Sequence, residues 1–318
     1  MNTTDRMLYS RRDFGTLMLA GLPLSVAAAR VKDSRFNGVL IGAITYSYRA
    51  IPDAEAILKA MAQEGLSEVE LMSNHAEALA GAPAQGRGGP GGGRRGEPMT
   101  PEEQAAAKAR ADDLNAWRKS MTPDRFKNVR KNFNDAGIDV RLLTYNMNTS
   151  TTDEDLEYGF QMAKALGVRA ITTSTQVSMA KRIAPFAEKH QMIVGFHGHD
   201  QVDRPDEVST EATFQAVMAE SKYHGCNLDI GHYTAANGDP VDFIRKYHDR
   251  ITNLHLKDRK KNHGPNMPFG EGDTPIKEVL QLLKQNRYDF PGNIEFEYQG
   301  DPLVEVPKCI EYCKNALT

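Results

Sequence analysis

The amino-acid sequence predicts a (β/α)₈ barrel, and three observations support this fold class. Short apolar segments rich in β-branched residues alternate with longer segments of helical period from residue 39 onward. The alternation can be counted, and it gives eight strand–helix repeats. These repeats occupy roughly 280 residues, which is the usual size of such a barrel. An open, doubly wound sheet is the alternative architecture for the same alternation.

Each element can be placed on the sequence. Strands are expected at Val39–Thr45, Glu68–Leu71, Val140–Tyr145, Ala170–Ser174, Ile193–His197, Asn227–Ile230, Ile251–Leu256 and Asn293–Phe296. Helices are expected at Ala54–Gln63, Pro123–Asp135, Asp153–Ala165, Met179–His190, Glu211–Ser221, Val241–His248, Pro275–Gln285 and Val306–Ala316. Pro123 after Thr122 indicates a helix start, and Gly65, Gly137 and Gly167 indicate helix ends.

The composition is that of a globular protein with a large core. The 318 residues are 40% apolar and 25% charged, and the formal net charge is -3. A charge this small gives no electrostatic footprint for nucleic acid or for an anionic membrane surface. We therefore expect a small-molecule partner, with a homo-oligomer as an alternative to a monomer.

The first 29 residues resemble a twin-arginine export signal. Arg11 and Arg12 precede a modest apolar run from Leu17 to Ala28, and small residues end the segment. The run is too short for a membrane span, so no stable membrane anchor is expected. A frayed amphipathic helix is the alternative interpretation. The signal predicts a periplasmic or exported protein, with the barrel occupying residues 30–318.

One segment interrupts the alternation. Residues 81–97 are rich in glycine and arginine and cannot form a packed core. They follow the second expected strand, on the face where barrel enzymes build their sites, and precede a helix-like stretch, Pro101–Lys119, that contains Trp117. The segment is either a mobile lid over the barrel mouth or a solvent-exposed insertion.

Polar residues gather where the expected strands end. In a (β/α)₈ barrel these ends meet at one mouth, so the residues there are candidates for a site. The residues in question are Glu70 after the second strand, His197 and His199 after the fifth, Asp229 and His232 after the sixth, His255, Lys257 and Asp258 after the seventh, and Glu295 and Glu297 after the eighth.

The histidines indicate a metal. Six of the nine lie at or just after strand ends, where imidazole and carboxylate groups from neighbouring strands converge. Such mixed ligands suit Mn²⁺, Zn²⁺, Co²⁺ or Fe²⁺ better than Ca²⁺. We expect Mn²⁺ first, with Mg²⁺ also open.

Two pairs of candidate ligands cannot be resolved by the alternation of side chains along a strand. His197 and His199 share one face of their strand, as do Glu295 and Glu297, so either member of each pair can point inward. The earlier member lies closer to the last layer of the barrel and is expected to bind the metal. The later member is then placed to reach the substrate.

At these residues the chain resembles the sugar phosphate isomerase/epimerase family of xylose-isomerase-like barrels. The resemblance covers nearly everything from Val39 to Leu317. The motifs that carry it are Ile41 to Ser47, Val69-Glu70-Leu71, Phe196-His197-Gly198-His199, Leu228 to His232, Asn253 to Asp258, and Phe269 to Asp273.

The resemblance implies a ligand set. Family members hold one divalent metal with an aspartate, a histidine and a glutamate at the positions of Asp229, His255 and Glu295. His197 departs from the family, because many relatives have glutamate there. This exchange lowers the ligand charge by one and leaves the metal more electrophilic.

The resemblance also implies the chemistry, which is proton removal next to a carbonyl through an enediolate. His199, His232, Lys257 and Glu297 are the candidate acid and base residues, and a lysine near a metal is expected to have a lowered pKa. Substrate contacts are expected from Glu70, Tyr46, Trp117 and Asp258. For Glu70, support of the metal site or a structural role is the alternative.

These inferences predict a metal-dependent isomerase or epimerase acting on a carbohydrate. The mouth lacks an evident phosphate site, although Arg49, Arg259 and Lys260–Lys261 keep one open, so a neutral keto-sugar is preferred. A 3-keto-glycoside lyase or hydratase on the same scaffold is the first alternative. A non-catalytic periplasmic sugar-binding protein is the second, but the sequence lacks the aromatic-rich mouth and two lobes expected of it.

Overall fold

The computed structural model describes residues 33–84 and 100–318. The expected export signal at 1–29 lies outside these residues, as does most of the glycine- and arginine-rich insertion. Within the described part, no helix combines the length and apolar character needed to cross a membrane.

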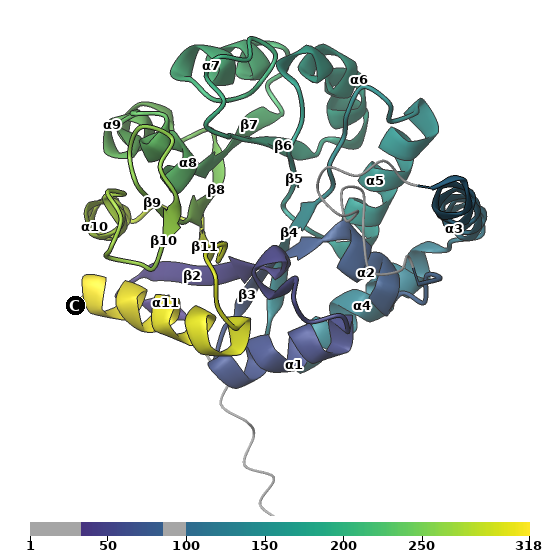
Figure 1. Ribbon diagram of the computed structural model, residues 1–318, viewed down its shortest axis with the longest axis horizontal. Coiled ribbons are helices and arrows are strands. Elements are labelled where there is room, and N and C mark those ends of the chain that lie inside the picture. The colour runs from purple at the N-terminus through teal and green to yellow at the C-terminus, as the bar shows by residue number, and fades with distance from the viewer. Residues whose placement is uncertain (1–32, 85–99) are drawn as a thin grey trace, which may run out of the picture. The chain divides into compact units, whose positions relative to one another are not determined.

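The strands close into a parallel barrel that helices surround (Figure 1). The order around the barrel is β2, β11, β8, β7, β6, β5, β4 and β3, and β3 pairs with β2 to close the ring. The eight strands are β2 (Val39–Ile44), β3 (Glu68–Met72), β4 (Asp139–Thr144), β5 (Ala170–Thr173), β6 (Ile193–His197), β7 (His224–Asp229), β8 (Ile251–Leu256) and β11 (Gly292–Ile294). The (β/α)₈ prediction is therefore confirmed.

The helices follow the strands as predicted, with two short additions at the mouth. They are α1 (Ala54–Glu64), α2 (Ser73–Leu79), α3 (Pro101–Lys119), α4 (Pro123–Asp135), α5 (Asp153–Leu166), α6 (Ala180–His190), α7 (Glu211–Ala219), α8 (Ile230–Ala235), α9 (Pro240–Tyr247), α10 (Ile276–Asn286) and α11 (Pro302–Ala316). Helices α2 and α8 were not predicted. Gly65 and Gly167 end their helices at φ of 85° and 67°, left-handed values that glycine adopts readily.

Three two-residue strands lie outside the barrel. β1 (Arg35–Phe36) pairs antiparallel with β2, and β9 (Asp258–Arg259) pairs with β10 (Asn266–Met267) in the loop after β8. None of the three was predicted, because two residues are too few to show a period.

One strand boundary was wrong for a physical reason. The strand expected to continue to Ile230 ends at Asp229, and α8 begins at the next residue. The Asp229 side chain accepts a hydrogen bond from the backbone N–H of His232 at 2.7 Å, which caps the new helix. The apolar Ile230 therefore continues the sequence pattern of the strand while starting the helix.

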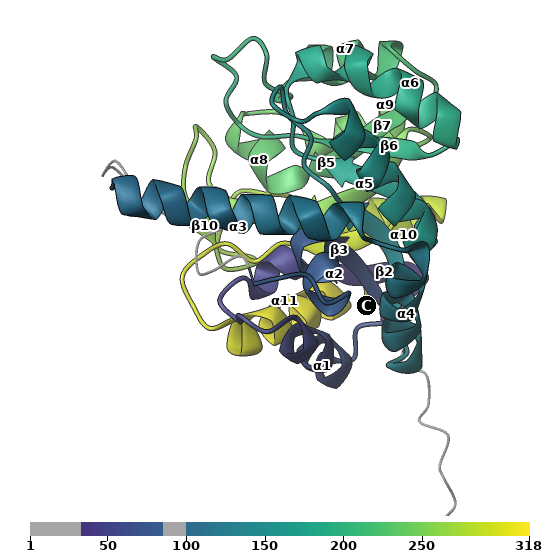
Figure 2. The same cartoon turned by 90° about the vertical axis from the view of Figure 1, so that its right-hand side faces the viewer.

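Helix α3 lies against the outside of the barrel over only part of its length. It has no buried residue, and in Figure 2 its N-terminal part extends beyond the neighbouring helices. Thr100 and Glu103 form a capping box at its start. Near its other end Trp117 packs against the core cluster, and Arg118 bonds Glu77 of α2 at 2.7 Å.

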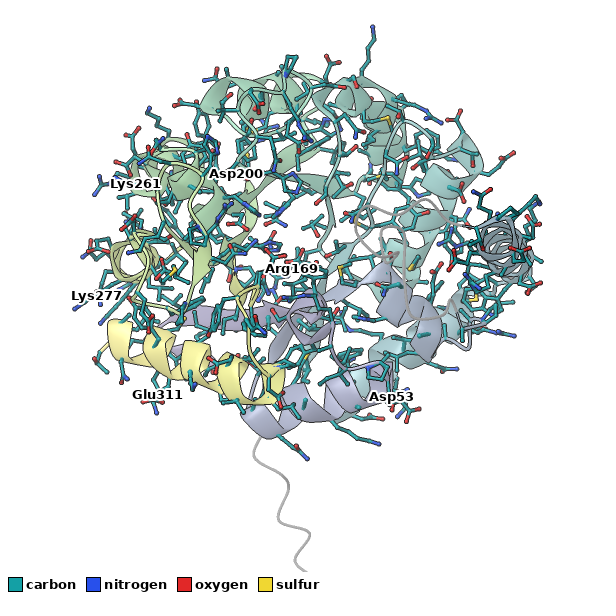
Figure 3. The ribbon with its side chains drawn as sticks, in the orientation of Figure 1. Asp53, Arg169, Asp200, Lys261, Lys277 and Glu311 are labelled. Atoms are coloured by element: carbon teal, nitrogen blue, oxygen red, sulfur yellow. The ribbon has the colours of Figure 1, made fainter. Side chains whose placement is uncertain are left out.

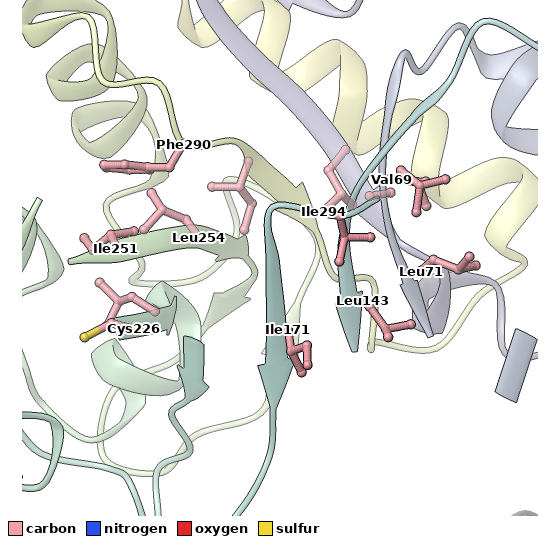
Figure 4. Packing of buried hydrophobic residues seen from close by; sticks show 14 of the residues in the cluster. Val69, Leu71, Leu143, Ile171, Cys226, Ile251, Leu254, Phe290 and Ile294 are labelled. Atoms are coloured by element: carbon pink, nitrogen blue, oxygen red, sulfur yellow. The ribbon is translucent and has the colours of Figure 1, made fainter. Parts of the chain in front are cut away.

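The hydrophobic core lies between the strands and the helices, and the inside of the barrel is polar. Along β3, Val69 and Leu71 belong to the buried apolar cluster (Figure 4), so the alternate residues Glu68 and Glu70 point into the barrel. Other polar side chains join Glu70 there, namely Thr144, Thr172, Asn227 and Asn253. This polar interior lies directly beneath the mouth and positions the site described next.

A pH effect on stability follows from Glu64 at the end of α1. Burial raises the pKa of Glu64 from 4.5 to about 7, although a hydrogen bond from Tyr48 opposes the shift. A raised folded-state pKa gives stability that is complete below pH 4.5 and is lost as the pH rises through about 7. We predict that the melting temperature of the wild-type protein falls over this range, and that the fall is smaller in Glu64→Gln.

Glu55→Gln, on the exposed side of the same helix, is the control and should keep the wild-type pH dependence. Parallel melting curves for wild type and Glu64→Gln across the range would contradict the assignment.

Candidate metal centre

Four buried residues meet at the mouth of the barrel: His197, Asp229, His255 and Glu295. They come from the ends of β6, β7 and β8 and from the residue after β11, and one ligand atom of each lies within 4.8 Å of the others. The strand register pairs Asp229 directly with His255, while His197 pairs with Asn227 and Glu295 comes two residues after the partner of His255 on β11. The structure thus brings together the four residues expected to bind a metal, including the earlier member of each ambiguous pair.

The unpaired polar atoms at this point indicate room for a cation. His197 Nδ1, Asp229 Oδ2, His255 Nδ1 and Glu295 Oε2 are buried, and none has a partner in hydrogen-bond geometry. His255 Nδ1 nevertheless lies 2.9 Å from Glu295 Oε2, within ion-pair range. A buried polar atom without a partner costs about 1–3 kcal/mol. A single divalent cation would accept all four lone pairs, so the residues fit a metal. Two imidazoles and two carboxylates form a donor set typical of Mn²⁺, Zn²⁺, Fe²⁺ or Co²⁺.

A carboxylate behind His255 fixes how its ring is presented. His255 Nε2 lies 2.7 Å from Glu70 Oε2, deep in the barrel. With Nε2–H donated to Glu70, Nδ1 is left as the nitrogen that faces the other three residues. Glu70 and Glu295 raise the pKa of His255 even though burial opposes them. His197 differs, because burial and the neighbouring His255 lower its pKa and favour the neutral ring, which is the form that binds metals.

The structure places Glu70 in a supporting position. It is fully buried, and besides His255 it accepts hydrogen bonds from Thr144, Thr172, Asn227 and Asn253. Both carboxylate oxygens are therefore occupied by protein groups. The expected contact of Glu70 with substrate is not available in this arrangement, and its alternative role behind the metal site agrees with the geometry.

Lys257 is the cation nearest to the centre. Its Nζ lies 2.9 Å from both Asp229 Oδ2 and Glu295 Oε2, and 2.7 Å from Glu297 Oε2. The contacts with Asp229 and Glu295 are within ion-pair range, but their angles do not meet hydrogen-bond geometry. The lowering of the Lys257 pKa beside a bound metal stays a prediction, because the protein groups alone shift the pKa the other way. Burial does lower it, but the three carboxylates outweigh burial and raise the pKa.

His232 lies beside Lys257 at the mouth of the barrel and also contacts Arg259. The His232 ring contacts Lys257 Nζ at 3.0 Å and Arg259 Nη1 at 2.6 Å. Asp200, which the sequence did not single out, pairs with Arg259 at 3.1 Å. Hydrogen bonding to His232, together with Arg259, lowers the pKa of Asp200 despite burial. Figure 3 shows Asp200 on the inner side of the ring of helices, whereas Asp53, Lys277 and Glu311 lie on the outside.

His199 forms an ion-pair contact that the sequence did not predict. Its Nδ1 lies 2.5 Å from Glu207 Oε1, and its ring centroid is 4.8 Å from that of His197. Glu207 follows β6 in an irregular loop, where no period marks a side chain as inward. The only sequence signal for Glu207 is that it is an acidic residue eight positions after the candidate base His199.

Tyr46 and Glu297 are two further candidate residues at the mouth. Tyr46 belongs to the short 3₁₀ helix Thr45–Tyr48 after β2, and burial together with Glu297 raises the pKa of its hydroxyl. The guanidinium of Arg49 lies 4.9 Å from the centre of the Tyr46 ring. Tyr46 and Glu297 are partly exposed, so both remain accessible for a substrate contact.

Two expected substrate contacts lie elsewhere. The carboxylate of Asp258 is buried and accepts backbone N–H groups from Gly270, Gly272 and Thr274, so it holds the loop after β10 instead of facing the mouth. Trp117 packs against the core cluster near the end of α3, and its buried Nε1 has no partner. The sequence placed Asp258 correctly after a strand but could not show that the following loop folds back onto it.

Comparison with known proteins identifies a family whose model matches most of the chain. Residues 97–315 match the model of the xylose isomerase-like TIM barrel family. L-ribulose-5-phosphate 3-epimerase of Escherichia coli is 34% identical over 88 residues, which is 27% of this chain and 31% of that protein. The chain therefore matches about a third of the length of this curated relative.

Solved structures share the fold at low sequence identity. A probable 3-DHS dehydratase of Bacillus anthracis, involved in petrobactin synthesis, has a TM-score of 0.59 and 15% identity over 86% of this chain and 99% of its own. The IOLI protein, whose crystal structure has a bound zinc atom, has a TM-score of 0.59 and 12% identity over 87% of this chain and 96% of its own. These similarities establish the fold.

The Glu70–His255 contact predicts how metal affinity depends on Glu70. Glu70→Gln keeps the size of the side chain but removes the charge that orients His255, so we predict a loss of metal affinity of about 10- to 100-fold. The measurement is competition for Mn²⁺ or Zn²⁺ against a chelator of known affinity.

Glu77→Gln is the matched control, because Glu77 is also a buried carboxylate but is held by Arg118 and Tyr158 near α3. Equal losses of metal affinity in the two variants would show that general destabilisation, and not the orientation of His255, is responsible.

Proposed function

Because the chain belongs to the xylose isomerase-like TIM barrel family, we propose that it is a divalent-metal-dependent enzyme of the sugar isomerase and epimerase type. Its reaction would be the removal of a proton next to the carbonyl of a keto-sugar. The observation that carries this proposal is the convergence of four buried, unpaired ligand atoms with acid and base residues at one mouth.

The metal would be held by His197, Asp229, His255 and Glu295, and it would supply positive charge against the oxygen of an enediolate. Mn²⁺ is the first candidate from the mixed donor set. Because the structurally similar IOLI protein has a bound zinc atom, Zn²⁺ should be tested alongside Mn²⁺.

The surrounding residues can move the proton. His199 is held through Nδ1 by Glu207, which leaves Nε2 as the nitrogen that can act as a base. On the other wall Lys257 carries a proton and lies 2.7 Å from Glu297, so this pair can return a proton to the substrate. His232 contacts Lys257 and holds it in place. A base that removes the proton and an acid that returns one are what an exchange of configuration at one carbon requires.

The charges at the mouth favour a neutral sugar. Arg259 is occupied by Asp200 and by the carbonyl oxygen of Gly264, and Lys260 pairs with Asp273. Arg49, which lies above Tyr46, and Lys261 remain exposed, and these two of the expected cations could meet a phosphate. A sugar phosphate, the substrate type in the name of the Escherichia coli relative, is therefore the second substrate class to test.

A lyase or hydratase is the alternative outcome of the same first step. The charged Lys257 ammonium is a proton donor of the kind that a departing alkoxide needs, and this observation favours elimination from a 3-keto-glycoside. Together with the proposed export signal at residues 1–29, this reaction would take place on oxidised sugars in the periplasm.

Proton exchange separates these outcomes. We predict that the metal-loaded protein in D₂O incorporates deuterium next to the carbonyl of a keto-sugar, and that Asp229→Ala loses both bound metal and exchange. Release of the aglycone from a 3-keto-glucoside would identify a lyase, and exchange without cleavage would identify an isomerase or epimerase. Tight sugar binding without exchange on any keto-sugar or sugar phosphate would instead identify a binding protein.

Lys257 allows a test of whether the centre holds a metal or only an ion-pair network. In a metal centre the ammonium repels the cation, so Lys257→Met should bind metal as tightly as the wild type or more tightly while proton exchange falls by about 10²-fold or more. Lys260→Met, at a half-exposed lysine on the next loop, is the control and should change neither quantity. Absence of metal binding in the wild type, together with a lower melting temperature of Lys257→Met, would mean that the lysine is itself the structural cation.

A further inference from the structure

A cavity lies at the end of the barrel opposite the candidate metal centre. It has a volume of about 450 Å³, and its lining includes Ala170, Ile193, His224 and Ile251. Each of these is the first residue of its strand, in β5, β6, β7 and β8. Because the strands are parallel, the cavity opens at their N-terminal ends and is separate from the mouth.

Positive charge is concentrated around this cavity. Its lining includes the cationic residues Arg141, Arg169, Lys222, Arg250 and Arg287 and the acidic residues Asp249 and Asp289. Five cations face two carboxylates, in a chain whose formal net charge is -3. An excess of one sign inside a concave, partly buried surface attracts ions of the other sign.

Arg141 is the buried cation of the group. Its side chain is only 7% exposed, its Nε is buried without a hydrogen-bond partner, and its nearest carboxylate is Asp289 at 3.7 Å. That carboxylate is 73% exposed and is shared with Arg169, which lies 3.1 Å from it. One solvated carboxylate between two guanidinium groups leaves donors available. Burial and repulsion from Arg169 lower the pKa of Arg141, although Glu68, Asp289 and Asp139 oppose the shift.

Arg250 contributes charge but not donors. Its guanidinium bonds the backbone carbonyl oxygens of Met218, Ser221 and His224, which anchors it in the wall. Arg141 and Arg169, which share the Asp289 carboxylate, therefore keep planar N–H donors for a ligand, and Arg287, an exposed arginine of the same lining, adds further donors. Planar guanidinium groups match the oxygens of phosphate, and two of them can share a dianion. Arg169 is labelled near the centre of the ring in Figure 3.

An aromatic wall adjoins the cations. The His248 and Tyr288 rings stack at 4.8 Å and 15°, and Tyr288 stacks on Phe290 at 5.4 Å and 21°. All three line the same cavity. Flat apolar rings beside guanidinium groups provide a surface for the organic part of a small phosphorylated molecule.

We propose that this cavity is a binding site for a phosphate dianion, held by Arg141 and Arg169 at the N-terminal end of the barrel. The dianion is either free phosphate or the phosphate group of a small organic ester. The site is independent of the proposed catalytic centre, because it shares no residue with it and lies at the other end of the strands.

The test is titration calorimetry of the chelator-treated full chain with inorganic phosphate and, separately, with glucose 6-phosphate, with glucose as the uncharged control. We expect phosphate-bearing ligands to bind and glucose not to bind. Arg141→Gln and Arg169→Gln should each weaken binding about 10-fold or more, and added salt should weaken it further. Tighter binding of the ester than of inorganic phosphate would identify the ester as the ligand.

Three variants make the outcome decisive. Arg169 is 61% exposed, so Arg169→Gln should fold normally even if Arg141→Gln loses stability. Arg182→Gln, an exposed arginine paired with Asp153 on another face, should bind phosphate as the wild type does. Asp229→Ala removes the metal centre and should also leave phosphate binding unchanged. The proposal is overturned if phosphate does not bind at millimolar concentration, or if Arg169→Gln and Arg182→Gln bind it equally.

Discussion

The hydrogen bond between His255 Nε2 and Glu70 Oε2 is the interaction on which the rest of the site depends. It fixes the ring of His255 inside the barrel and leaves Nδ1 to face Asp229, His197 and Glu295. Nδ1 lies 2.9 Å from Glu295 Oε2, so the imidazole ring is held between two carboxylates. Because Glu70 holds Nε2, loss of the proton from Nδ1 would leave a lone pair directed at the other three residues.

Glu70 can play this part only because the barrel interior is polar. A buried carboxylate is unfavourable unless donors surround it, and two threonines and two asparagines from β4, β5, β7 and β8 supply those donors. Asn253 also bonds Asn293, which in turn bonds Glu68 deeper in the barrel. The hydrogen bonds thus extend from the metal centre down into the barrel. The apolar packing that stabilises the fold lies on the outer faces of the strands, against the helices.

Much of this architecture could be predicted from the sequence, because it depends on local periodicity. The strand segments, most helices and the ligand residues at strand ends all follow from alternation and from the rule that barrel sites lie at the C-terminal ends of strands. The placement of His197, and not His199, in the cluster of four candidate ligands agrees with its shorter distance from the last barrel layer.

The remaining features depend on contacts between segments that are distant in the sequence. Glu70 lies 185 residues from His255, so its supporting role could not be distinguished from a substrate contact. Asp258 follows a strand like a site residue, but its loop folds back and occupies it with backbone N–H groups. The three carboxylates that converge on Lys257 from other strands and raise its pKa were also not evident from the sequence.

The central claim is that two imidazole nitrogens, from His197 and His255, and two carboxylates bind one metal ion at the mouth. Pulsed electron paramagnetic resonance of the Mn²⁺-loaded protein, made with ¹⁵N-labelled histidine, tests it most directly. The account predicts couplings from two directly bound histidine nitrogens, falling to one in His197→Ala and in His255→Ala. A spectrum without any directly bound histidine nitrogen would contradict it.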